Sequence, residues 1–476
     1  MKCKDIEISV ESGHPFAEDR LNRKPLACNL TDIANIYAES GAVIALDGEW
    51  GAGKTTFVRM WHQMLLDNSY KSIYFNAWNT DFEDDPFIAL MSELNEVFHK
   101  SKTFNKVVAS GAKIGIKVLG EVTKGVIHKA TGIDTDTIKA GVDELVGQCY
   151  NQMSDYKEKK DSLCQFRNNL SEFVASEADG KPVFFFIDEL DRCNPHYAVK
   201  LLERVKHLFE VPNIIFVLTV NLNQLQYAVQ GFYGSSNIDG REYLRRFIDI
   251  EYTLPTPNME EYCKFLYDAY DFRTFFEHHS RMADRNLQSE GQMFNEVSNN
   301  VIVASNISLR AANKIFAYTR LALSGYNLTQ HFSADLFFLL CYFKVTNRPL
   351  YNQIKNGDFS IQKLLEAMEE NLPNAIFNPD DTSFAMHNLS YTVATLLIQY
   401  NYPTRGMARE PNFKGQQNDE NSDMIFPIKC TKFNLAKLNE ALTYESKNRY
   451  NLYGLQSAFN KIDLIDSLKL ANISEG

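Results

Sequence analysis

Apolar and β-branched residues gather in five short runs within the first 254 residues, and each run has the length of one β-strand. Pro255 and Pro257 close off the fifth run, because proline breaks a strand. The predicted strands are Ala42–Asp47, Ser72–Ala77, Val183–Asp188, Ile214–Asn221 and Asp249–Leu254. Apolar residues at helical spacing separate the third run from the fourth. Strands that alternate with helices predict a parallel sheet covered on both faces.

Helical patterns fill most of the remaining sequence. One such stretch interrupts the strands, and another follows Pro257, apart from polar stretches near 280–300 and 405–424. The stretch 405–424 is poor in apolar residues, and we expect a mobile loop there. The pattern predicts an α/β fold with a parallel-sheet core in two parts, a helical insertion, and a helical lid with a C-terminal helical domain. The corresponding ranges are 1–90 and 181–257 for the core, 91–180 for the insertion and 258–476 for the helical lid and C-terminal domain.

Composition adds little to the fold but limits the partners and the compartment. The 476 residues include 45% hydrophobic and 23% charged residues, with a formal net charge of −11. An acidic balance argues against sequence-independent nucleic-acid binding over the whole surface and leaves a local basic patch open. The eight cysteines show no C-x-x-C spacing, which fits a reducing compartment. The chain has no signal-peptide pattern and no apolar run of about 18 residues, so we expect a cytoplasmic protein.

A glycine-rich loop follows the first predicted strand. Residues 48–55 read GEWGAGKT and match G-x-x-x-x-G-K-[ST] between a strand and a helix, the context that this phosphate-binding motif requires. Lys54 would reach the β- and γ-phosphates, and Thr55 would hold Mg²⁺ through its hydroxyl. The alternative is a glycine-rich turn that fits by chance. The residues expected to bind the nucleotide are Gly48, Trp50, Gly51, Ala52, Gly53, Lys54, Thr55 and Thr56.

The third predicted strand ends in two acids. In FFFIDELDR, four apolar residues and Asp188 are followed at once by Glu189. The carboxyl end of a buried parallel strand opens onto the ligand crevice, so Asp188 is expected to hold Mg²⁺ through water. Glu189 is expected to be the general base that activates the attacking water. The loop alone predicts nucleotide binding and the acid pair predicts hydrolysis, most simply of ATP; the alternative is a solvated acidic turn.

Four more polar residues are candidates for contacts with the terminal phosphate. Asn221 ends the fourth predicted strand and is expected to sense the γ-phosphate or the lytic water, although asparagine is also a common turn residue. Arg245 and Arg246 precede the fifth strand, where AAA+ ring ATPases carry an arginine finger for the neighbouring subunit. Arg310 opens a helix in the second domain and is a candidate sensor from the lid. The alternative for Arg245 and Arg246 is a pair of surface arginines or a structural ion pair, and the alternative for Arg310 is a helix-surface arginine.

The helical insertion carries a stripe of lysines. Lys106, Lys113, Lys117 and Lys124 are spaced 7, 4 and 7 apart, which places them on one helical face. One interpretation of the Lys106–Lys129 segment is a helix that contacts an anionic membrane surface or nucleic acid. The alternative is the solvated face of an ordinary packed helix.

Together these segments resemble the KAP family of P-loop NTPases over residues 10–325. The resemblance lies in GEWGAGKTTF, in FNAW at Phe75–Trp78, in FFFIDELDRCNP, in FVLTVN and in YLRRFIDIEYTLPTP. It also includes the D-x-L-x-R lead-in Asp19–Arg23, which in the family lies near the nucleotide base, so Arg23 is a further expected nucleotide contact. The chain departs from the family at Asn221, where many members carry Asp, and at Arg245-Arg246, where relatives often read Glu-Lys. Many relatives also insert transmembrane helices, which this insertion lacks.

The resemblance implies a function. It implies a Mg²⁺-dependent ATPase that oligomerises and acts as a nucleotide-driven assembly or remodelling protein, with ATP and Mg²⁺ as cofactors. Bacterial relatives of the family are linked to phage exclusion, which implies a role in antiviral defence. The alternative is a nucleotide-gated scaffold that recruits an effector protein from another chain, with hydrolysis only resetting it. The sequence shows no nuclease, protease or deaminase signature.

Overall fold

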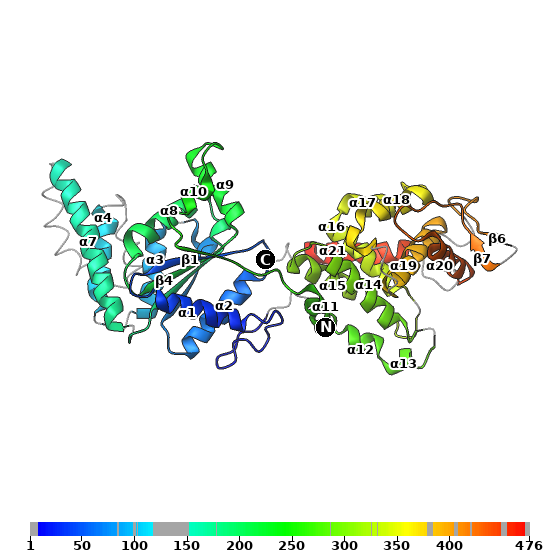
Figure 1. Ribbon diagram of the computed structural model, residues 1–476, viewed down its shortest axis with the longest axis horizontal. Coiled ribbons are helices and arrows are strands. Elements are labelled where there is room, and N and C mark those ends of the chain that lie inside the picture. Colours follow the sequence, from blue (N-terminus) through cyan, green and yellow to red (C-terminus); the bar gives the residue numbers. More distant parts are fainter. Residues whose placement is uncertain are drawn as a thin grey trace. The chain divides into compact units, whose positions relative to one another are not determined.

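The structure is a computed structural model in which the chain forms two compact units (Figure 1). One unit spans Ile8–Thr256, and the other begins at Pro257. Each unit is described here by itself. The residues that the structure describes are 8–82, 85–98, 101, 103–117, 152–177, 179–285, 287–324, 326–330, 332–377, 384–403, 408–418, 421–448 and 455–471.

The N-terminal unit is built on a five-stranded sheet in the order β2-β3-β4-β1-β5. All neighbouring strands are parallel, as the sequence predicted. The strands are β1 (Ala42–Asp47), β2 (Ser72–Asn76), β3 (Val183–Asp188), β4 (Ile214–Val220) and β5 (Ile250–Thr253). The register places Asp47 beside Val220, and Asp188 beside Asn76 and Thr219. The polar residues that end these strands therefore share one edge of the sheet.

Burial explains why β3 and β4 are apolar along their whole length. Every residue of both strands is buried, because helices cover both faces of the sheet. Phe184 and Phe186 point to one face and contact Trp61 of helix α2 (Lys54–Asp67), with ring centroids 5.8 and 5.1 Å from that of Trp61. Phe185 points to the other face and stacks on Phe216 at 5.3 Å. Successive residues of one strand thus supply two separate cores.

The helices of this unit surround the sheet (Figure 1). They are α1 (Lys24–Ile36), α2 (Lys54–Asp67), α3 (Pro86–Phe98), α4 (Phe104–Lys117), α7 (Gln152–Glu177), α8 (Pro195–Arg204), α9 (Leu222–Tyr233) and α10 (Gly240–Leu244). Short helical turns also occur at Ala77–Thr80 and Leu190–Arg192. In the predicted insertion, α4 packs on α7 through Phe104 and Phe173, whose centroids are 5.0 Å apart.

Only part of the predicted lysine stripe lies within the described residues. Lys106 and Lys113 are exposed on α4, while Val107 and Ile114 on the same helix are buried. This is the ordinary division of a packed helix into a core face and a solvent face. Lys124 and Lys129, and the side chain of Lys117, lie outside what the structure describes.

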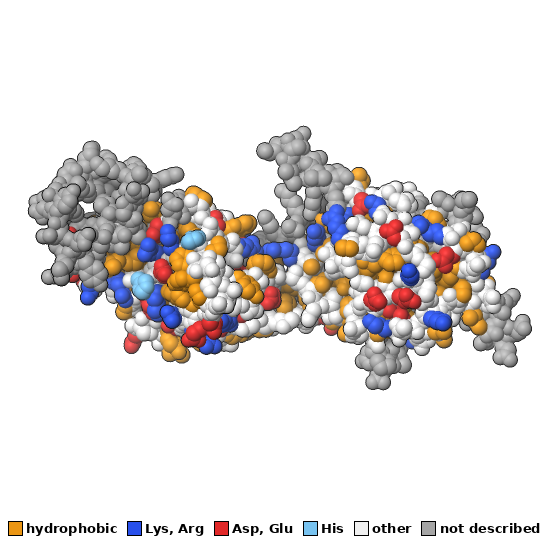
Figure 2. Space-filling model, turned by 90° about the horizontal axis from the view of Figure 1, so that it is seen from above, with side chains coloured by type: hydrophobic (Ala, Val, Ile, Leu, Met, Phe, Trp, Pro, Cys, Tyr) orange, Lys and Arg blue, Asp and Glu red, His pale blue; other side chains and the backbone are white. Residues whose placement is uncertain are grey.

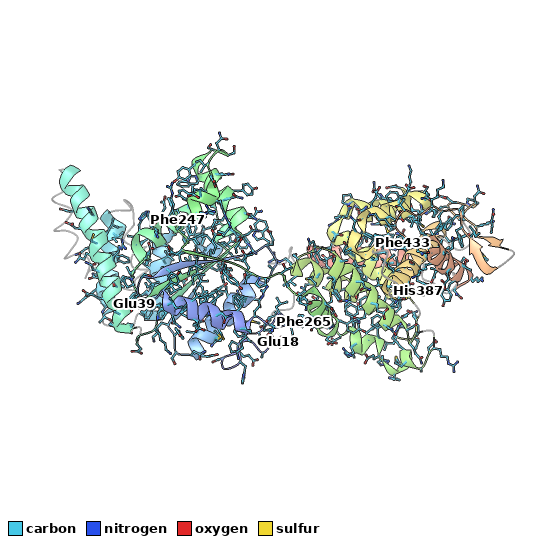
Figure 3. All side chains as sticks on the ribbon, in the orientation of Figure 1. Glu18, Glu39, Phe247, Phe265, His387 and Phe433 are labelled. Carbon is cyan, nitrogen blue, oxygen red and sulfur yellow. The ribbon has the colours of Figure 1, made fainter. Side chains whose placement is uncertain are left out.

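The C-terminal unit is mostly helical, as predicted. Its helices are α11 (Met259–Ala269), α12 (Phe272–Phe276), α13 (His279–Met282), α14 (Glu290–Ala304), α15 (Leu309–Leu323), α16 (Ala334–Thr346), α17 (Arg348–Asn356), α18 (Ile361–Asn371), α19 (Phe384–Asn401), α20 (Leu435–Asn448) and α21 (Leu455–Ala471). Helix α16 is buried from Ala334 to Lys344, so it forms the centre of the unit. Phe265, His387 and Phe433, labelled in Figure 3, belong to this unit.

The expectation of a mobile loop over 405–424 is wrong for its second half. Gln416–Asn418 and Asn421–Ile425 form an antiparallel pair, β6 and β7. Contacts beyond the pair hold it, because the backbone N–H of Met424 donates to the Thr443 hydroxyl at 2.9 Å. Phe426 also packs on Phe413 at 5.3 Å. These strands are too short and too polar to show an alternating pattern, so the sequence did not reveal them.

The surface of each unit carries charges of both signs. On the face seen in Figure 2, the coloured Lys and Arg side chains are interspersed with Asp and Glu and with apolar residues. Within the described part of the chain, no helix has both the length and the apolar character needed to cross a bilayer.

Candidate nucleotide site

The loop between β1 and α2 has the backbone conformation that a phosphate loop needs. Gly51 and Gly53 have φ angles of 82° and 79°, a left-handed region that residues with a side chain rarely adopt. Helix α2 starts at Lys54, immediately after Gly53. The unpaired N–H groups and the positive dipole end of a 14-residue helix therefore face the loop.

Lys54 is buried under this loop, with only 9% of its surface exposed. Its Nζ donates hydrogen bonds to the carbonyl oxygens of Gly48 and Glu49. Burial lowers the pKa of Lys54, and nearby carboxylates oppose that shift and keep the ammonium charged. The carboxylates around the ammonium are those of Asp191, Asp47, Asp188 and Glu49.

Arg23 supports the loop from the N-terminal lead-in. Its guanidinium group donates to the carbonyl of Ala52 at 2.9 Å and to that of Gly53 at 3.1 Å. The side chain is buried, which lowers its pKa, and Asp19 opposes the shift. Two donors fixed on consecutive carbonyls hold the loop in its curved conformation. The predicted contact between Arg23 and the nucleotide base stays a prediction.

The two residues expected to share a metal ion lie together. Asp188 is 1% exposed at the end of β3 and accepts a hydrogen bond from the Thr55 hydroxyl. It also accepts one from Tyr74 at 2.8 Å and one from the backbone N–H of Glu189 at 2.9 Å. Burial is the largest influence and raises the pKa of Asp188. A buried carboxylate beside a hydroxyl is a suitable ligand pair for a hard divalent cation.

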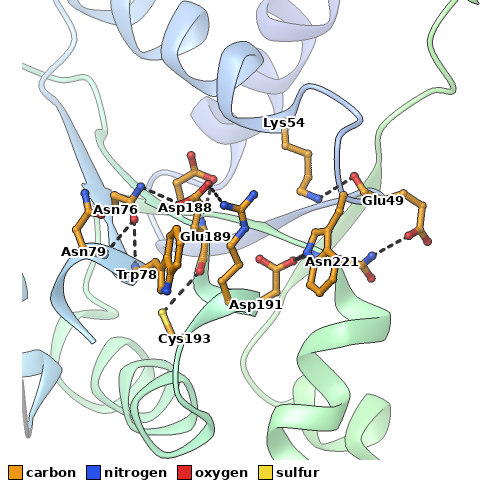
Figure 4. A network of polar contacts seen from close by, with 12 residues as sticks. Glu49, Lys54, Asn76, Trp78, Asn79, Asp188, Glu189, Asp191, Cys193 and Asn221 are labelled. Atoms are coloured by element: carbon orange, nitrogen blue, oxygen red, sulfur yellow. Dashed lines mark hydrogen bonds and ion pairs between the residues drawn. The ribbon is translucent and has the colours of Figure 1, made fainter. Parts of the chain in front are cut away.

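Glu189 is held on two sides (Figure 4). Its Oε1 forms an ion pair with Arg192 at 2.7 Å, and its Oε2 accepts a hydrogen bond from Asn76 at 3.2 Å. The Arg192 guanidinium also lies over the Trp78 ring, 5.6 Å from its centroid. The backbone of Glu189 is left-handed, with a φ of 61°, which is uncommon for a residue with a side chain. The expected base is therefore positioned at the sheet edge and engaged by two neighbours.

Asp191 connects the loop to the end of β4. Its Oδ2 accepts hydrogen bonds from the Trp50 indole at 2.7 Å and from the backbone N–H of Asn221 at 2.9 Å. The Asn221 side chain is buried and donates to Glu49 at 2.9 Å, while its oxygen caps α9. Because β4 lies between β1 and β3, Asn221 stands between the phosphate loop and the acid pair (Figure 4).

The three candidate arginines have separate environments. Arg245 and Arg246 follow α10 and are exposed. Arg245 pairs with Glu242 at 2.9 Å, and Arg246 lies 5.9 Å from the ring centroid of Tyr243. Arg310 is exposed on α15 of the C-terminal unit. Their predicted roles at the terminal phosphate stay predictions.

Sequence reasoning missed several residues of this network: Asn76, Tyr74, Asp191, Arg192 and Glu49. One signal was present, because FNAW and FFFIDELDR end neighbouring strands and the register pairs Asn76 with Asp188. The contacts themselves depend on side-chain directions in a left-handed turn. No spacing rule gives those directions.

The described residues fit a magnesium nucleotide. The Lys54 ammonium donates to two loop carbonyls, and the oxygens of a triphosphate bound at the loop can replace those carbonyls as acceptors. No group of three His, Cys, Asp or Glu within the described residues is placed to hold a metal ion unaided. That agrees with Mg²⁺, which commonly takes one or two protein ligands and completes its shell with phosphate oxygens and water. The fold and the loop together define a P-loop NTPase.

The chain belongs to the KAP family of P-loop NTPases, since the family model described as KAP family P-loop domain matches residues 23–336. The resemblance stated from the motifs is thereby confirmed. A sequence relative is the Phage T7 exclusion protein of Escherichia coli (strain K12), 22% identical over 288 residues. The match spans 57% of this chain and 36% of that protein, so the chain corresponds to about a third of its relative.

The comparison with solved structures found origin recognition proteins among its matches, all at low TM-scores. The Aeropyrum pernix ORC2 protein in its ADPNP–ADP complexes is 11% identical, with 98% of this chain and 99% of that chain covered and a TM-score of 0.34. The ADP form of the same protein is 12% identical, with 78% of each chain covered and a TM-score of 0.37. Drosophila ORC bound to DNA is 12% identical, with coverages of 94% and 86% and a TM-score of 0.30.

Proposed function

We propose that this protein is a Mg²⁺-dependent ATPase. The observation that carries the proposal is the arrangement at the carboxyl end of β3. Thr55 donates to Asp188, and Glu189 follows on the rim with its carboxylate at the same sheet edge. A P-loop that only bound nucleotide would have no need of a second acid in this position.

The chain's own groups have distinct tasks in this reaction. Lys54 and the loop N–H groups bind the phosphates, and Thr55 and Asp188 hold the metal ion. Bound Mg²⁺ supplies charge neutralisation to the phosphates. Glu189 accepts a proton from the attacking water at its carboxylate. Asn221 orients the water or the γ-phosphate from the end of β4.

The contacts of Glu189 with Arg192 and Asn76 affect its proposed role as the base. A carboxylate that is paired with Arg192 and accepts from Asn76 has fewer lone pairs left for a water molecule. Loss of one of these partners would free more of the carboxylate for the attacking water. We therefore propose that a local rearrangement of Arg192 or Asn76 increases turnover once nucleotide is bound.

Replacing the proposed base tests the proposal. We expect Glu189→Gln to keep nucleotide binding and to lower the rate of phosphate release by roughly 10²-fold or more, as is usual for loss of a general base. Fluorescent-nucleotide titration measures binding, and a phosphate sensor measures turnover. Glu172→Gln, at an exposed position of α7, is the matched control and should behave like the unmodified protein. Unchanged turnover in the Glu189 variant would eliminate this assignment.

The proposed biological role is a nucleotide-driven assembly or remodelling protein in antiviral defence. It rests on the family and on the relationship to the Phage T7 exclusion protein. In this proposal the chain forms a homo-oligomer, in which Arg245 or Arg246 completes a neighbour's site and Arg310 senses the γ-phosphate.

A second candidate function is a nucleotide-gated scaffold that recruits an effector protein from another chain. The restrained Glu189 favours it, because a base held by two partners allows a long-lived state with ATP bound. In that case hydrolysis only resets the assembly. A separate anionic partner, nucleic acid or a membrane surface, remains proposed for the Lys106–Lys129 segment.

A further inference from the structure

The C-terminal unit contains a pocket of about 690 Å³ that is distinct from the nucleotide site. This volume is typical of pockets that bind small organic ligands. Four helices contribute to it: α14, α16, α19 and α20. Its walls combine carboxylates from Glu290, Glu296, Asp335 and Glu445 with rings from Phe332, His387, Tyr391 and Tyr444.

Two of these carboxylates are deeply buried and close enough to repel each other. Asp335 is 5% exposed and Glu445 is 8% exposed. The charge of Asp335 raises the pKa of Glu445, after burial itself, which is the larger cause and brings that pKa to about 7. Within the described residues, no Lys, Arg or His forms an ion pair with either of them. Asp335 accepts hydrogen bonds from Thr392 and from backbone N–H groups, and Glu445 accepts one from Thr395.

The same unit pairs two of its buried cations directly, although its buried Glu369 is satisfied by Thr431 and backbone N–H groups instead. Lys344, on the same helix as Asp335, pairs with Asp463 at 2.9 Å, and Arg281 pairs with Glu290. The helix dipole helps to explain Asp335, which lies in the first turn of α16. The helix dipole destabilises the charge of Glu445, because Glu445 lies near the C-terminal end of α20, where a negative charge is disfavoured. Glu445 thus combines burial, a like-charged neighbour and an unfavourable helix end.

The aromatic rings that line the pocket with these acids favour one kind of positively charged ligand. The rings of His387 and Tyr391 are 4.8 Å apart, and Tyr391 meets Tyr444 edge to face at 5.7 Å. Ring faces attract ammonium and guanidinium groups. A bare metal ion fits poorly, because no described group of three acids or histidines has metal-holding geometry. Arg285 and His387 are the described basic side chains in the lining, and Arg285 is exposed.

We infer that this pocket binds an organic cation, an alkylammonium or guanidinium group that pairs with Glu445 and Asp335 and stacks on the aromatic wall. The cation is carried either by a free polyamine or by a basic side chain of a peptide. Both carriers present the same charged group on an apolar stem, which suits a pocket lined by buried acids and aromatic rings. The inference does not depend on nucleotide hydrolysis.

Calorimetric titration of the full-length chain tests the inference at pH 8 and about 0.15 M salt, where exposed charges are largely screened. One arm uses spermidine and the other a capped tripeptide with a central lysine. We expect saturable binding in at least one arm. Glu445→Gln and Tyr444→Leu should each weaken binding by about tenfold or more, which corresponds to about 1.4 kcal/mol. Tyr444 is exposed, so its replacement tests the pocket even where the buried variant perturbs folding.

Glu440→Gln is the matched control, because Glu440 is exposed on the same helix α20. It removes the same charge and should leave the affinity unchanged. A second readout is proton release in a titration repeated at pH 7, near the raised pKa of Glu445, since a cation that binds a partly protonated acid displaces its proton and makes the heat depend on the buffer. Binding equally strong in all three variants would mean general attraction to an acidic surface and would overturn the inference. Absence of saturable binding in both arms would overturn it as well.

Discussion

At the residue scale, the site is a set of polar side chains that restrain one another. Asp191 receives two donors from different elements, and Arg23 grips two consecutive loop carbonyls. Glu189 is shared between Arg192 and Asn76. These contacts hold the phosphate loop and the proposed base Glu189 in place. They also occupy part of the Glu189 carboxylate that the attacking water would need. The rate of the proposed reaction should therefore respond to single side chains that never touch the nucleotide.

Arg192→Ala tests this restraint on Glu189. Removing a partly buried ion-pair partner of roughly 1 kcal/mol should free the carboxylate and raise the basal turnover about fivefold. The KM for ATP should change little, because the side-chain contacts that the structure describes for Arg192 go to Glu189 and Trp78 and not to the phosphate loop. Steady-state kinetics measure both constants. Arg167→Ala, an exposed change on α7, serves as control.

A fall in kcat would give the opposite result. It would mean that Arg192 positions Glu189 for catalysis, and the idea of an engaged, inactive base would be withdrawn. The ionic-strength dependence separates the two cases further. An ion pair that restrains the base should weaken in salt, so the turnover of the unmodified protein should rise toward that of the variant.

At the element scale, helix ends decide where charges are tolerated. α2 begins at the phosphate loop, where its N-terminal N–H groups favour anions. α20 ends near Glu445, where its carbonyl groups disfavour an acid. Burial raises the pKa of Glu445 to about 7 and, against the opposing effect of Arg281, that of Glu290 to about 8. The folded C-terminal unit therefore binds protons more strongly than the unfolded chain between pH values near 4.5 and 8.

The sign of this linkage gives a stability prediction. Because the folded pKa values lie above the unfolded ones, the free energy of unfolding should fall as the pH rises from about 5 to 8. Glu445→Gln removes one of these groups and should flatten the decline, by at most about 3 kcal/mol at pH 8. Differential scanning calorimetry at several pH values measures the stability of the C-terminal unit. Its unfolding transition is the one that added ATP does not shift, because ATP is proposed to bind the other unit. Glu440→Gln should keep the original slope, and an identical slope in both variants would contradict the assignment.

The sequence predicted the elements better than their contacts. Strands β1 and β3 were predicted at their observed bounds, because apolar runs ended by charge are typical of buried parallel strands. The phosphate loop and the acid pair followed from spacing alone. Arg192 was part of the quoted FFFIDELDR, yet its pairing with Glu189 depends on a left-handed backbone that spacing does not encode. The acidic pocket joins Glu290, Asp335 and Glu445 across more than 150 residues of sequence, and no local pattern connects them.

At the scale of the whole molecule, the proposed arginine finger requires that one copy of the chain completes the nucleotide site of a second copy. Arg245 and Arg246 are exposed and lie outside the hydrogen-bonded network of the loop. Exposed guanidinium groups of this kind are available to a second copy of the chain. The proposal therefore couples the rate per chain to assembly.

Mixing two inactive variants tests this coupling. Lys54→Ala removes phosphate binding but keeps both arginines, and the double change Arg245→Ala with Arg246→Ala keeps the phosphate loop. We expect each variant alone to be inactive and the mixture to recover measurable phosphate release, because one chain then supplies the site and the other the finger. Arg167→Ala mixed with Lys54→Ala gives the reference rate. A mixture as inactive as its parts would exclude a finger acting between chains.

The path of the chain through β2 has a mechanical consequence. Asn76 is the last residue of β2, and the polypeptide leaves the sheet there for α3, α4 and α7 before it returns at Val183. The outgoing connection thus starts at Asn76, whose side chain donates to Glu189, at the carboxyl end of β2. The returning connection enters the sheet at the amino end of β3, which is the opposite end of the parallel strands. A displacement of those helices would act on the backbone that carries Asn76, and through it on the hydrogen bond from Asn76 to Glu189. A molecule that bound to the inserted helices would then change the position of the proposed base, Glu189, without entering the nucleotide site.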